Sequence, residues 1–286
     1  MNGPPDSEQK TPSFERIRAH INAHEFERAR AEGRLLLRSA STVETRRFGE
    51  VGDPDLSIVV VVSARVERTE PLLEAMTTLL CEPGCEVHLL ASGAEGLSRL
   101  AQRYFQNFLF TDFRSNVGPS VARNIGAKRV GGSTVVFLDD DGVCGPDDVR
   151  RLAGCVAEQG AVAARGRIVP KTPGAPGRSH YDLGPNCMYT PPSTEGFSAW
   201  DRETFLKLGG FDPAMFGHEG LDLTRRALET HAPEAFRYCN QAVLFHDYSN
   251  DRSQHDRKEQ RHSAMDAYMT WCGASMLDIL ERFPAK

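Results

Sequence analysis

Several patterns that assign a function quickly are missing from this sequence. The seven cysteines form no CxxC pair, and Cys81 and Cys85 bracket only a Glu-Pro-Gly turn. With no second Cys or His pair following, we do not expect a structural zinc site. The chain also has no GxGxxG or GxxxxGK[ST] segment. This argues against dinucleotide-dependent oxidoreductases and P-loop enzymes.

The sequence also lacks an excess of basic residues and any long apolar run. The formal net charge is -5, which argues against a nucleic-acid partner. The longest aliphatic run covers residues 56–62, whereas a bilayer crossing needs about 20 apolar residues. The polar start has no apolar signal region, and scattered thiols suit a reducing compartment. We therefore expect a soluble, cytoplasmic protein with no transmembrane segment.

The remaining material is typical of a globular α/β protein. Hydrophobic residues make up 40% of the 286 residues and charged residues 26%, as in ordinary folded domains. Apolar runs that suit buried strands alternate with segments of helical periodicity, which predicts βαβ units and a mostly parallel sheet flanked by helices. The expected strands are 57–62, 86–90, 107–110 and 133–138, and the expected helices are 71–80, 96–106 and 117–130.

The last of these strands runs directly into Asp139, Asp140 and Asp141, followed by Gly142. Adjacent carboxylates repel one another, so a cluster of them costs free energy unless a cation or hydrogen-bond donors compensate. A divalent metal suits such oxygen ligands. A solvated acidic turn is the alternative, because Asp and Gly are common turn residues.

Two enzyme families place acids after a strand in this way. The run from Asp139 to Val143 resembles the Asp-x-Asp-Gly-Thr/Val motif of haloacid-dehalogenase phosphatases, and Asp139 with Asp141 resembles the Asp-x-Asp motif of nucleotide-sugar transferases. The phosphatase motif normally lies on an early strand. Here the acids follow three βα units, which favours the transferase.

The flanking segments resemble the family 2 glycosyltransferases of GT-A fold. Residues 116–126 are similar to the family's N-x-G-x-x-x-A-R-N-x-G helix, and residues 196–202, 208–212 and 217–223 are similar to its acceptor-side signature. The resemblance extends from about Ser57 to His246. It implies a GT-A domain with a Rossmann-like sheet and helical extensions at both ends.

The expected organisation follows from this resemblance. A disordered tail is predicted over 1–11, an N-terminal helical extension over 12–50, the GT-A domain over 51–250, and a C-terminal lid and helix over 251–286. Within the domain, 51–145 would be the nucleotide-binding half and 146–250 the acceptor-binding half. The terminal helices offer a surface for a homodimer.

The resemblance also implies a donor site and a metal site. Arg123, Asn124, Asp139 and Asp140 would contact the nucleotide sugar. The acid that helps to read the base in the family is absent after the second strand, so Ser63, Arg65 and Ser92 are candidate replacements. Mn²⁺ or Mg²⁺ would be held by Asp141, Asp139 and His246, with Asp247 as the neighbouring alternative to the histidine.

The acceptor side departs from the family at one position. The usual Glu-Asp pair appears as Glu219-Gly220, so Glu219 becomes the candidate catalytic base of an inverting reaction. A retaining reaction that needs no such base is the alternative. Asp222 is expected to anchor the following helix, and Trp200 and Phe216 either stack on sugars or belong to the core.

The sequence thus predicts a metal-dependent glycosyltransferase. It would move a sugar from a nucleoside-diphosphate donor, with UDP-sugars favoured, to a hydroxyl of a saccharide, lipid-linked or small-molecule acceptor. Two alternatives are a degenerate protein that binds nucleotide sugars without transfer, and a phosphatase that uses Asp139 and Asp141. Basic side chains of 251–261 form either a lid over the diphosphate or a solvated helix face.

Overall fold

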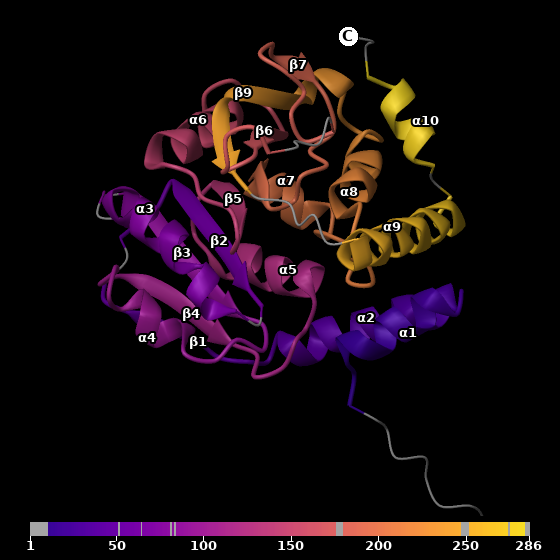
Figure 1. Cartoon of the computed structure of the whole chain (residues 1–286), viewed down its shortest axis with the longest axis horizontal. Helices are drawn as coiled ribbons and strands as arrows, with labels where there is room; N and C mark the ends of the chain where they lie inside the picture. Colours follow the sequence, from indigo (N-terminus) through magenta and orange to yellow (C-terminus); the bar gives the residue numbers. More distant parts are fainter. Residues whose placement is uncertain are drawn as a thin grey trace, which may run out of the picture.

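The computed structural model describes residues 11–50, 52–63, 65–80, 82, 84–175, 180–246, 252–273 and 275–283. The predicted disordered tail lies outside these ranges except for Thr11, and so does Asp247. The strands of the described chain form one mixed sheet in the order β1-β4-β3-β2-β5-β8-β6-β9-β7. Figure 1 shows this sheet running through the middle of the molecule between layers of helices.

The centre of the sheet is a run of parallel strands, as the apolar segments predict. The strands are β2 (Leu56–Val62), β3 (Cys85–Ala91), β4 (Phe108–Asp112) and β5 (Thr134–Asp139). Leu56 pairs with Cys85 on one side and with Thr134 on the other. The strands are buried on both faces, and apolar residues make up most of each one. Their carboxyl ends open on a common edge, where ligands bind in such sheets.

Antiparallel pairs extend this parallel centre on both sides. β8 (Phe197–Asp201) lies antiparallel between β5 and β6 (Ala163–Val169), and β9 (Phe236–Phe245) runs parallel to β6. The short β7 (Met188–Tyr189) and β1 (Thr45–Phe48) form the two edges.

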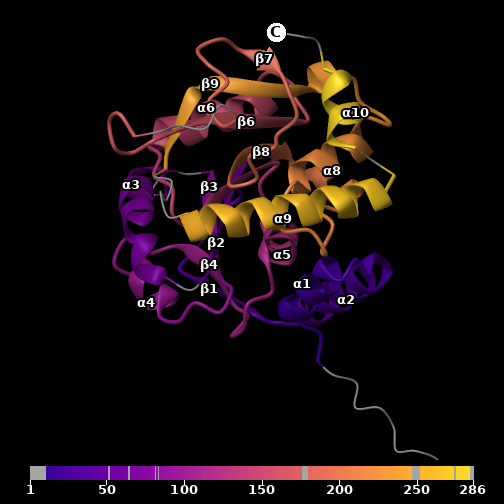
Figure 2. The same cartoon turned by 45° about the vertical axis from the view of Figure 1, so that its right-hand side comes forward.

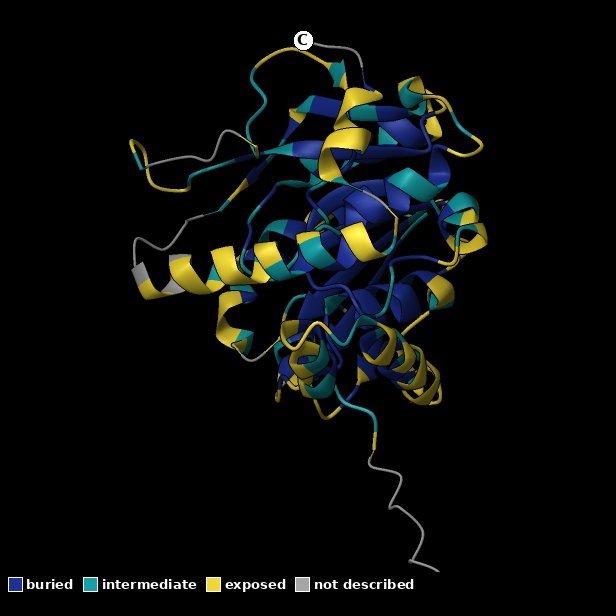
Figure 3. Cartoon of the chain, turned by 90° about the vertical axis from the view of Figure 1, so that its right-hand side faces the viewer, coloured by how far each residue is buried: buried dark blue, intermediate teal, exposed yellow. Residues whose placement is uncertain are grey.

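Helices cover both faces and bury a separate apolar core on each. α3 (Glu70–Leu80), α4 (Leu97–Ala101) and α6 (Pro146–Ala157) pack on one face, and α5 (Pro119–Arg129), α7 (Arg202–Lys207) and α8 (Glu219–Ala227) on the other. Two short 3₁₀ turns, Val66–Arg68 and Pro233–Ala235, complete the connections. Figure 3 shows the buried interior enclosed by helices whose outward faces are exposed.

The terminal helices join the second of these layers. α1 (Phe14–Asn22) and α2 (Phe26–Ala40) pack together and lie against α9 (Arg252–Trp271) and α5, while α10 (Met276–Glu281) contacts α8 (Figure 2). The guanidinium Nε of Arg30 donates to the Tyr268 hydroxyl over 3.1 Å. Ile17 and Ile21 are fully buried, so the apolar face of α1 is used within this chain. None of the helices in the described ranges combines the length and the hydropathy that a bilayer crossing requires.

Three expected elements differ from the structure. The predicted helical extension 12–50 contains strand β1, which pairs with β4. The helix expected over 96–106 spans only Leu97–Ala101. The C-terminal lid and helix expected over 251–286 contain two helices, because Gly273 adopts a left-handed φ of 80° and Ser275 caps α10 by accepting from the Asp278 amide over 3.0 Å.

Candidate active site

A cleft of about 1830 Å³ opens at the carboxyl ends of the parallel strands. Its floor includes Ser63 after β2, Ser92 after β3, and the three aspartates that begin at the end of β5. Its walls come from the 180–195 segment, the start of α8, the middle of α9, and α1 and α10 at the far end. This volume is ample for a nucleotide sugar together with part of an acceptor.

Asp140 ties the aspartate turn to the neighbouring strand. Its Oδ2 accepts the backbone N–H of Ser63 over 3.0 Å. Burial raises the pKa of Asp140 to about 7, with smaller contributions from the charges of Asp139 and Asp141. The predicted donor-side residues Ser63 and Asp140 therefore lie together on the cleft floor.

Asp141 and His246 form a pair across β5 and β9. Asp141 Oδ2 lies 3.1 Å from His246 Nε2, and the His246 amide donates to the Val169 carbonyl over 2.8 Å. Burial alone would raise the pKa of Asp141, but the hydrogen bond and charge of His246 outweigh it and the pKa is lowered. The ammonium of Lys171 also donates to the Asp141 carbonyl oxygen over 2.9 Å.

Asp139 faces the guanidinium of Arg123 instead. Arg123 Nη2 donates to Asp139 Oδ1 over 2.6 Å, and the arginine side chain is only 6% exposed. Burial would lower the pKa of Arg123, but the charges of Asp139, Glu219 and Glu195 outweigh it and the pKa is raised. A buried cation thus balances several carboxylates at one point of the cleft.

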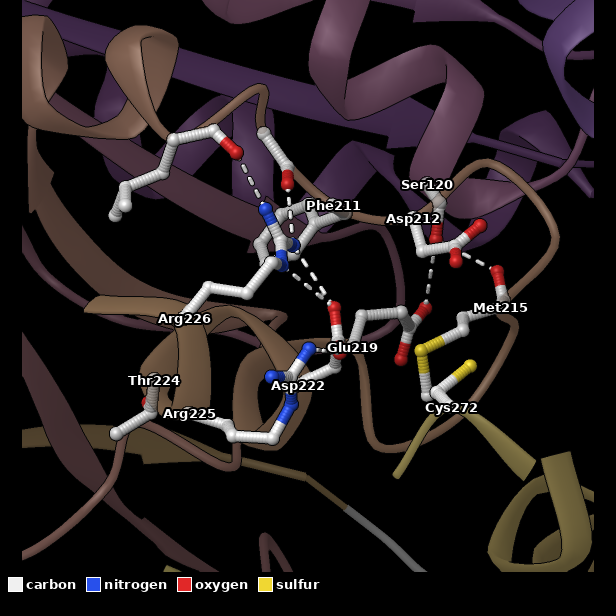
Figure 4. Close-up of polar contacts among 12 residues, drawn as sticks. Ser120, Phe211, Asp212, Met215, Glu219, Asp222, Thr224, Arg225, Arg226 and Cys272 are labelled. Atoms are coloured by element: carbon white, nitrogen blue, oxygen red, sulfur yellow. Dashed lines mark hydrogen bonds and ion pairs between the residues drawn. The ribbon is translucent and has the colours of Figure 1, made fainter. Parts of the chain in front are cut away.

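Glu219 is the second carboxylate on this arginine. It is the first residue of α8, its Oε1 lies 3.5 Å from Arg123 Nη1, and the Ser120 hydroxyl donates to it over 3.4 Å (Figure 4). The side chain is only 4% exposed. Burial and the nearby charge of Glu195 raise the pKa of Glu219 to about 7.

The metal prediction is only partly reflected in this arrangement. Within the described residues, no three His, Cys, Asp or Glu side chains converge on a point that could hold a metal ion, because Asp139 is engaged by Arg123. Asp141 and His246 nevertheless offer one oxygen and one nitrogen side by side. Mg²⁺ in phosphate-transfer sites is commonly held by one or two carboxylates together with substrate phosphates, and the Asp141 carboxylate fits such a site.

The other residues predicted for the donor side differ in whether they line the cleft. Arg65 is exposed and does not line the cleft. Asn124 is buried, donates to the Phe211 carbonyl over 2.7 Å and accepts from the Phe211 amide over 2.9 Å, so it holds the loop before α8. Ser92 lines the cleft, but its hydroxyl oxygen accepts the Val117 amide over 3.0 Å.

The aromatic and acidic residues predicted for the acceptor side also differ in their positions. Trp200 is fully buried between β5 and β6 and belongs to the core, so a sugar-stacking role for it is wrong, whereas Phe216 lines the cleft. Asp222 anchors α8 as expected: its Oδ2 accepts from Arg226 Nε over 2.9 Å. Arg226 Nη2 in turn donates to the Gly210 carbonyl over 2.7 Å (Figure 4).

Several polar residues that line the cleft were not singled out from the sequence. Arg68 follows β2, Glu195 precedes β8, and His218 and Asp266 face each other with Nε2 and Oδ1 3.2 Å apart. A positive φ of 63° at His218 is unusual for a non-glycine residue. No periodicity marks these positions, since each stands in an irregular segment or on a polar helix face.

Basic residues of α9 border this cleft. Arg257, Lys258 and Arg261 on α9 are among its lining residues. Lys258 Nζ donates to the Tyr181 hydroxyl over 3.3 Å and lies 5.2 Å from the centre of that ring. α9 is therefore joined to the opposite wall of the cleft, in the position that a lid would take.

The fold is that of the GT-A glycosyltransferases. The family model for glycosyl transferase family 2 matches residues 57–219. The chain therefore belongs to glycosyl transferase family 2, and the protein is a glycosyltransferase. This family assignment excludes the phosphatase alternative.

Solved structures agree on the fold. S. aureus TarS 1–349 superimposes with a TM-score of 0.53 at 13% identity, covering 76% of this chain and 72% of that one. TarS in complex with UDP gives 0.55 at 15%, covering 76% and 64%. The mannosyltransferase PcManGT from Pyrobaculum calidifontis, in complex with GDP-Man and Mn²⁺, gives 0.58 at 15%, covering 91% and 75%. A search of curated proteins found no match.

Proposed function

We propose that the protein transfers a sugar from a nucleoside-diphosphate sugar to an acceptor hydroxyl in a reaction that depends on Mn²⁺ or Mg²⁺. The observation that carries this proposal is the Asp141–His246 pair, which stands at the end of β5 in a cleft of about 1830 Å³. TarS has been solved with UDP and with UDP-GlcNAc, and PcManGT with GDP-Man and Mn²⁺. UDP-sugars remain the first choice of donor.

The proposed donor site follows from the residues on the cleft floor. Asp141 and His246 would hold the metal ion, which when bound neutralises the charge of the departing diphosphate. Arg123 would keep Asp139 in place on the donor side, and Ser63 and Asp140 would border the nucleotide. The division into a nucleotide-binding half over 51–145 and an acceptor-binding half over 146–250 belongs to this proposal.

The proposed acceptor site lies at the other end of the cleft. Phe14 of α1, Phe216 before α8, and Met276 and Leu280 of α10 border it. The outcome would be inverting, because carboxylates stand on the acceptor side, where a general base must accept the hydroxyl proton. Glu219 and Glu195 are the two candidates. The cytoplasmic location and the homodimer through the terminal helices remain predictions.

Thermal stabilisation tests the function directly. We would screen UDP-, GDP-, CMP- and dTDP-sugars with and without Mn²⁺ on the wild type, on Asp141→Ala, and on the exposed control Asp53→Ala. A ligand at a hundredfold excess over its Kd stabilises by about 2.7 kcal/mol. We expect a metal-dependent shift with one nucleotide that Asp141→Ala loses and Asp53→Ala keeps.

Two other outcomes of the screen would be informative. Stabilisation that is equal with and without Mn²⁺ would remove the metal from the mechanism. Stabilisation without any release of nucleoside diphosphate, even with acceptors supplied, would favour a protein that binds nucleotide sugars without transfer.

A further inference from the structure

We infer that Glu195 is the carboxylate that takes the proton from the acceptor hydroxyl, and that Glu219 behind it is a positioning residue. The inference rests on the proposed function, since it concerns the proton transfer of that same reaction. It departs from the sequence prediction, which gave the role of base to Glu219.

The backbone at Glu195 is fixed against the donor side of the cleft. The Asp139 amide donates to the Gly196 carbonyl over 3.0 Å. A Cβ atom at position 196 would lie 2.0 Å from Asp139 Cγ, so only glycine allows this approach. A tight turn holds the segment, because the Phe197 amide donates to the Thr194 carbonyl over 3.0 Å. Glu195 is therefore the chain neighbour of a glycine whose backbone contacts Asp139, the last residue of β5.

The side chain of Glu195 is held by the first turn of α8. Its Oε1 accepts the Gly220 N–H over 2.7 Å, and this N–H is one of the backbone donors that the first turn of a helix leaves without an intrahelical partner. A Cβ atom at position 220 would lie 2.1 Å from the Pro192 carbonyl oxygen and 3.1 Å from Glu195 Oε1. The glycine thus lets the 192–195 segment close onto the helix.

The other oxygen of Glu195 is available to a ligand. Among the described residues, Oε2 has no hydrogen-bond partner, and Glu195 lines the cleft with intermediate exposure. A base must come within hydrogen-bond reach of the proton that it accepts. Glu195 can meet this condition, because one oxygen is held by the Gly220 N–H and the residue lines the cleft.

Glu219 is placed differently. Its side chain is only 4% exposed, and its Oε1 is engaged by Ser120 and Arg123. Burial and the charge of Glu195 favour its protonated form. We assign it the role of holding Arg123 in place, which keeps the local charge balanced while Glu195 reacts.

The proposed step balances as follows. Glu195 accepts the proton of the acceptor hydroxyl, and the oxygen lone pair forms the new bond to the anomeric carbon. The bond from that carbon to the phosphate oxygen breaks, and its electron pair leaves with the nucleoside diphosphate. The proton on Glu195 then passes to water.

The test compares Glu195→Gln with Glu219→Gln, using Glu203→Gln on α7, whose side chain is 75% exposed, as a matched control. UDP-GlcNAc and GDP-mannose with Mn²⁺ are the probes, and release of nucleoside diphosphate to water is the readout. The amide oxygen of the glutamine at 195 can still accept the Gly220 N–H. We expect kcat to fall by about 100-fold or more in Glu195→Gln, since a general base contributes about 10²–10⁴, with an unchanged KM for the donor.

Rescue distinguishes a base from a structural carboxylate. Formate added to Glu195→Ala should restore part of the rate, and Glu195→Asp should retain more activity than Glu195→Gln. Thermal melting checks that each variant is folded. A normal kcat in folded Glu195→Gln together with a lost kcat in Glu219→Gln would overturn the inference and return the role to Glu219. Wild-type protein that neither binds nor turns over any donor would instead overturn the proposed function itself.

Discussion

Arg123 Nη2 lies 2.6 Å from Asp139 Oδ1, which joins the buried face of α5 to the carboxyl end of β5. The same guanidinium reaches Glu219 at the start of α8 over 3.5 Å. One arginine therefore connects the end of β5 with the start of α8. Because the residue is 5% exposed, its charge is compensated by protein carboxylates rather than by water.

Removal of Arg123 should destabilise the whole protein. Arg123→Ala would leave Asp139 and the buried Glu219 without their cation, and breaking the buried Arg123–Glu219 pair in this way costs about 3–5 kcal/mol. Urea denaturation of the variant measures the loss. Arg68→Ala removes an exposed arginine that also lines the cleft, and its free energy of unfolding should change little. Equal stability of both variants would contradict the compensating role of Arg123.

The titration of Glu219 and Asp140 should lower the free energy of unfolding as the pH rises from about 4 to 7. Burial raises the pKa of Glu219 from 4.5 to about 7 and that of Asp140 from 3.8 to about 7. The folded state then binds more protons than the unfolded state across this window, so stability is highest below it. Each group can contribute a slope of up to about 1.4 kcal/mol per pH unit.

Glu219→Gln checks this pH dependence. The variant should show a shallower decline of the unfolding free energy between pH 4.5 and 7, measured by urea denaturation in metal-free buffer. Glu203→Gln, whose native side chain is 75% exposed, should keep the wild-type slope. An unchanged slope in Glu219→Gln would mean that its carboxyl titrates normally in the folded protein.

Phe14 links the N-terminal extension to the active site. Its ring packs at 90° against Phe216 with centroids 5.5 Å apart, and it lies over Gly118, where a Cβ atom would meet the ring at 2.6 Å. Phe14→Ala should cost about 3–5 kcal/mol, as is usual for a buried Phe. Leu35→Ala on α2 is the control, since Leu35 is 44% exposed. A loss of similar size in both would contradict this packing role.

His246 should determine the metal dependence of donor binding. His246→Ala removes the nitrogen that lies 3.1 Å from Asp141 Oδ2, so the additional stabilisation that Mn²⁺ gives with the donor should shrink or vanish. EDTA should have the same effect on the wild type. His231→Ala, outside the cleft, should respond to Mn²⁺ like the wild type. A full Mn²⁺ effect in His246→Ala would remove this residue from the ligand set.

The centre of the sheet was predictable because hydrophobic pattern and structure coincide there. The run of valines in β2 is buried on both faces, and this local signal needs no knowledge of distant contacts. β6 lacks such a signal, since two arginines and a glycine interrupt it. Arg165 in this strand is nevertheless 1% exposed, and its Nη1 donates to the Ser193 hydroxyl oxygen over 2.9 Å.

The candidate site was predictable where residues follow a strand or stand in a motif that resembles the family. The aspartate turn and His246 meet the first condition, Arg123 and Glu219 meet the second, and all of them line the cleft. Glu195 could not be found in this way, because its contact with Gly220 joins residues 25 positions apart in the sequence. The motif around Asn124 was visible, but the motif alone does not show that its amide is occupied by Phe211.

The walls of the cleft have a consequence for how the protein matures on the ribosome. α9 and α10 follow every strand of the sheet in the sequence, yet they border the same cleft as α1. The parallel strands can pair while the rest of the chain is still being made, since domains generally form from the N-terminal side during synthesis. A nascent chain that already carries the aspartate turn therefore has an incomplete cleft, and activity should begin only when the last helices have emerged.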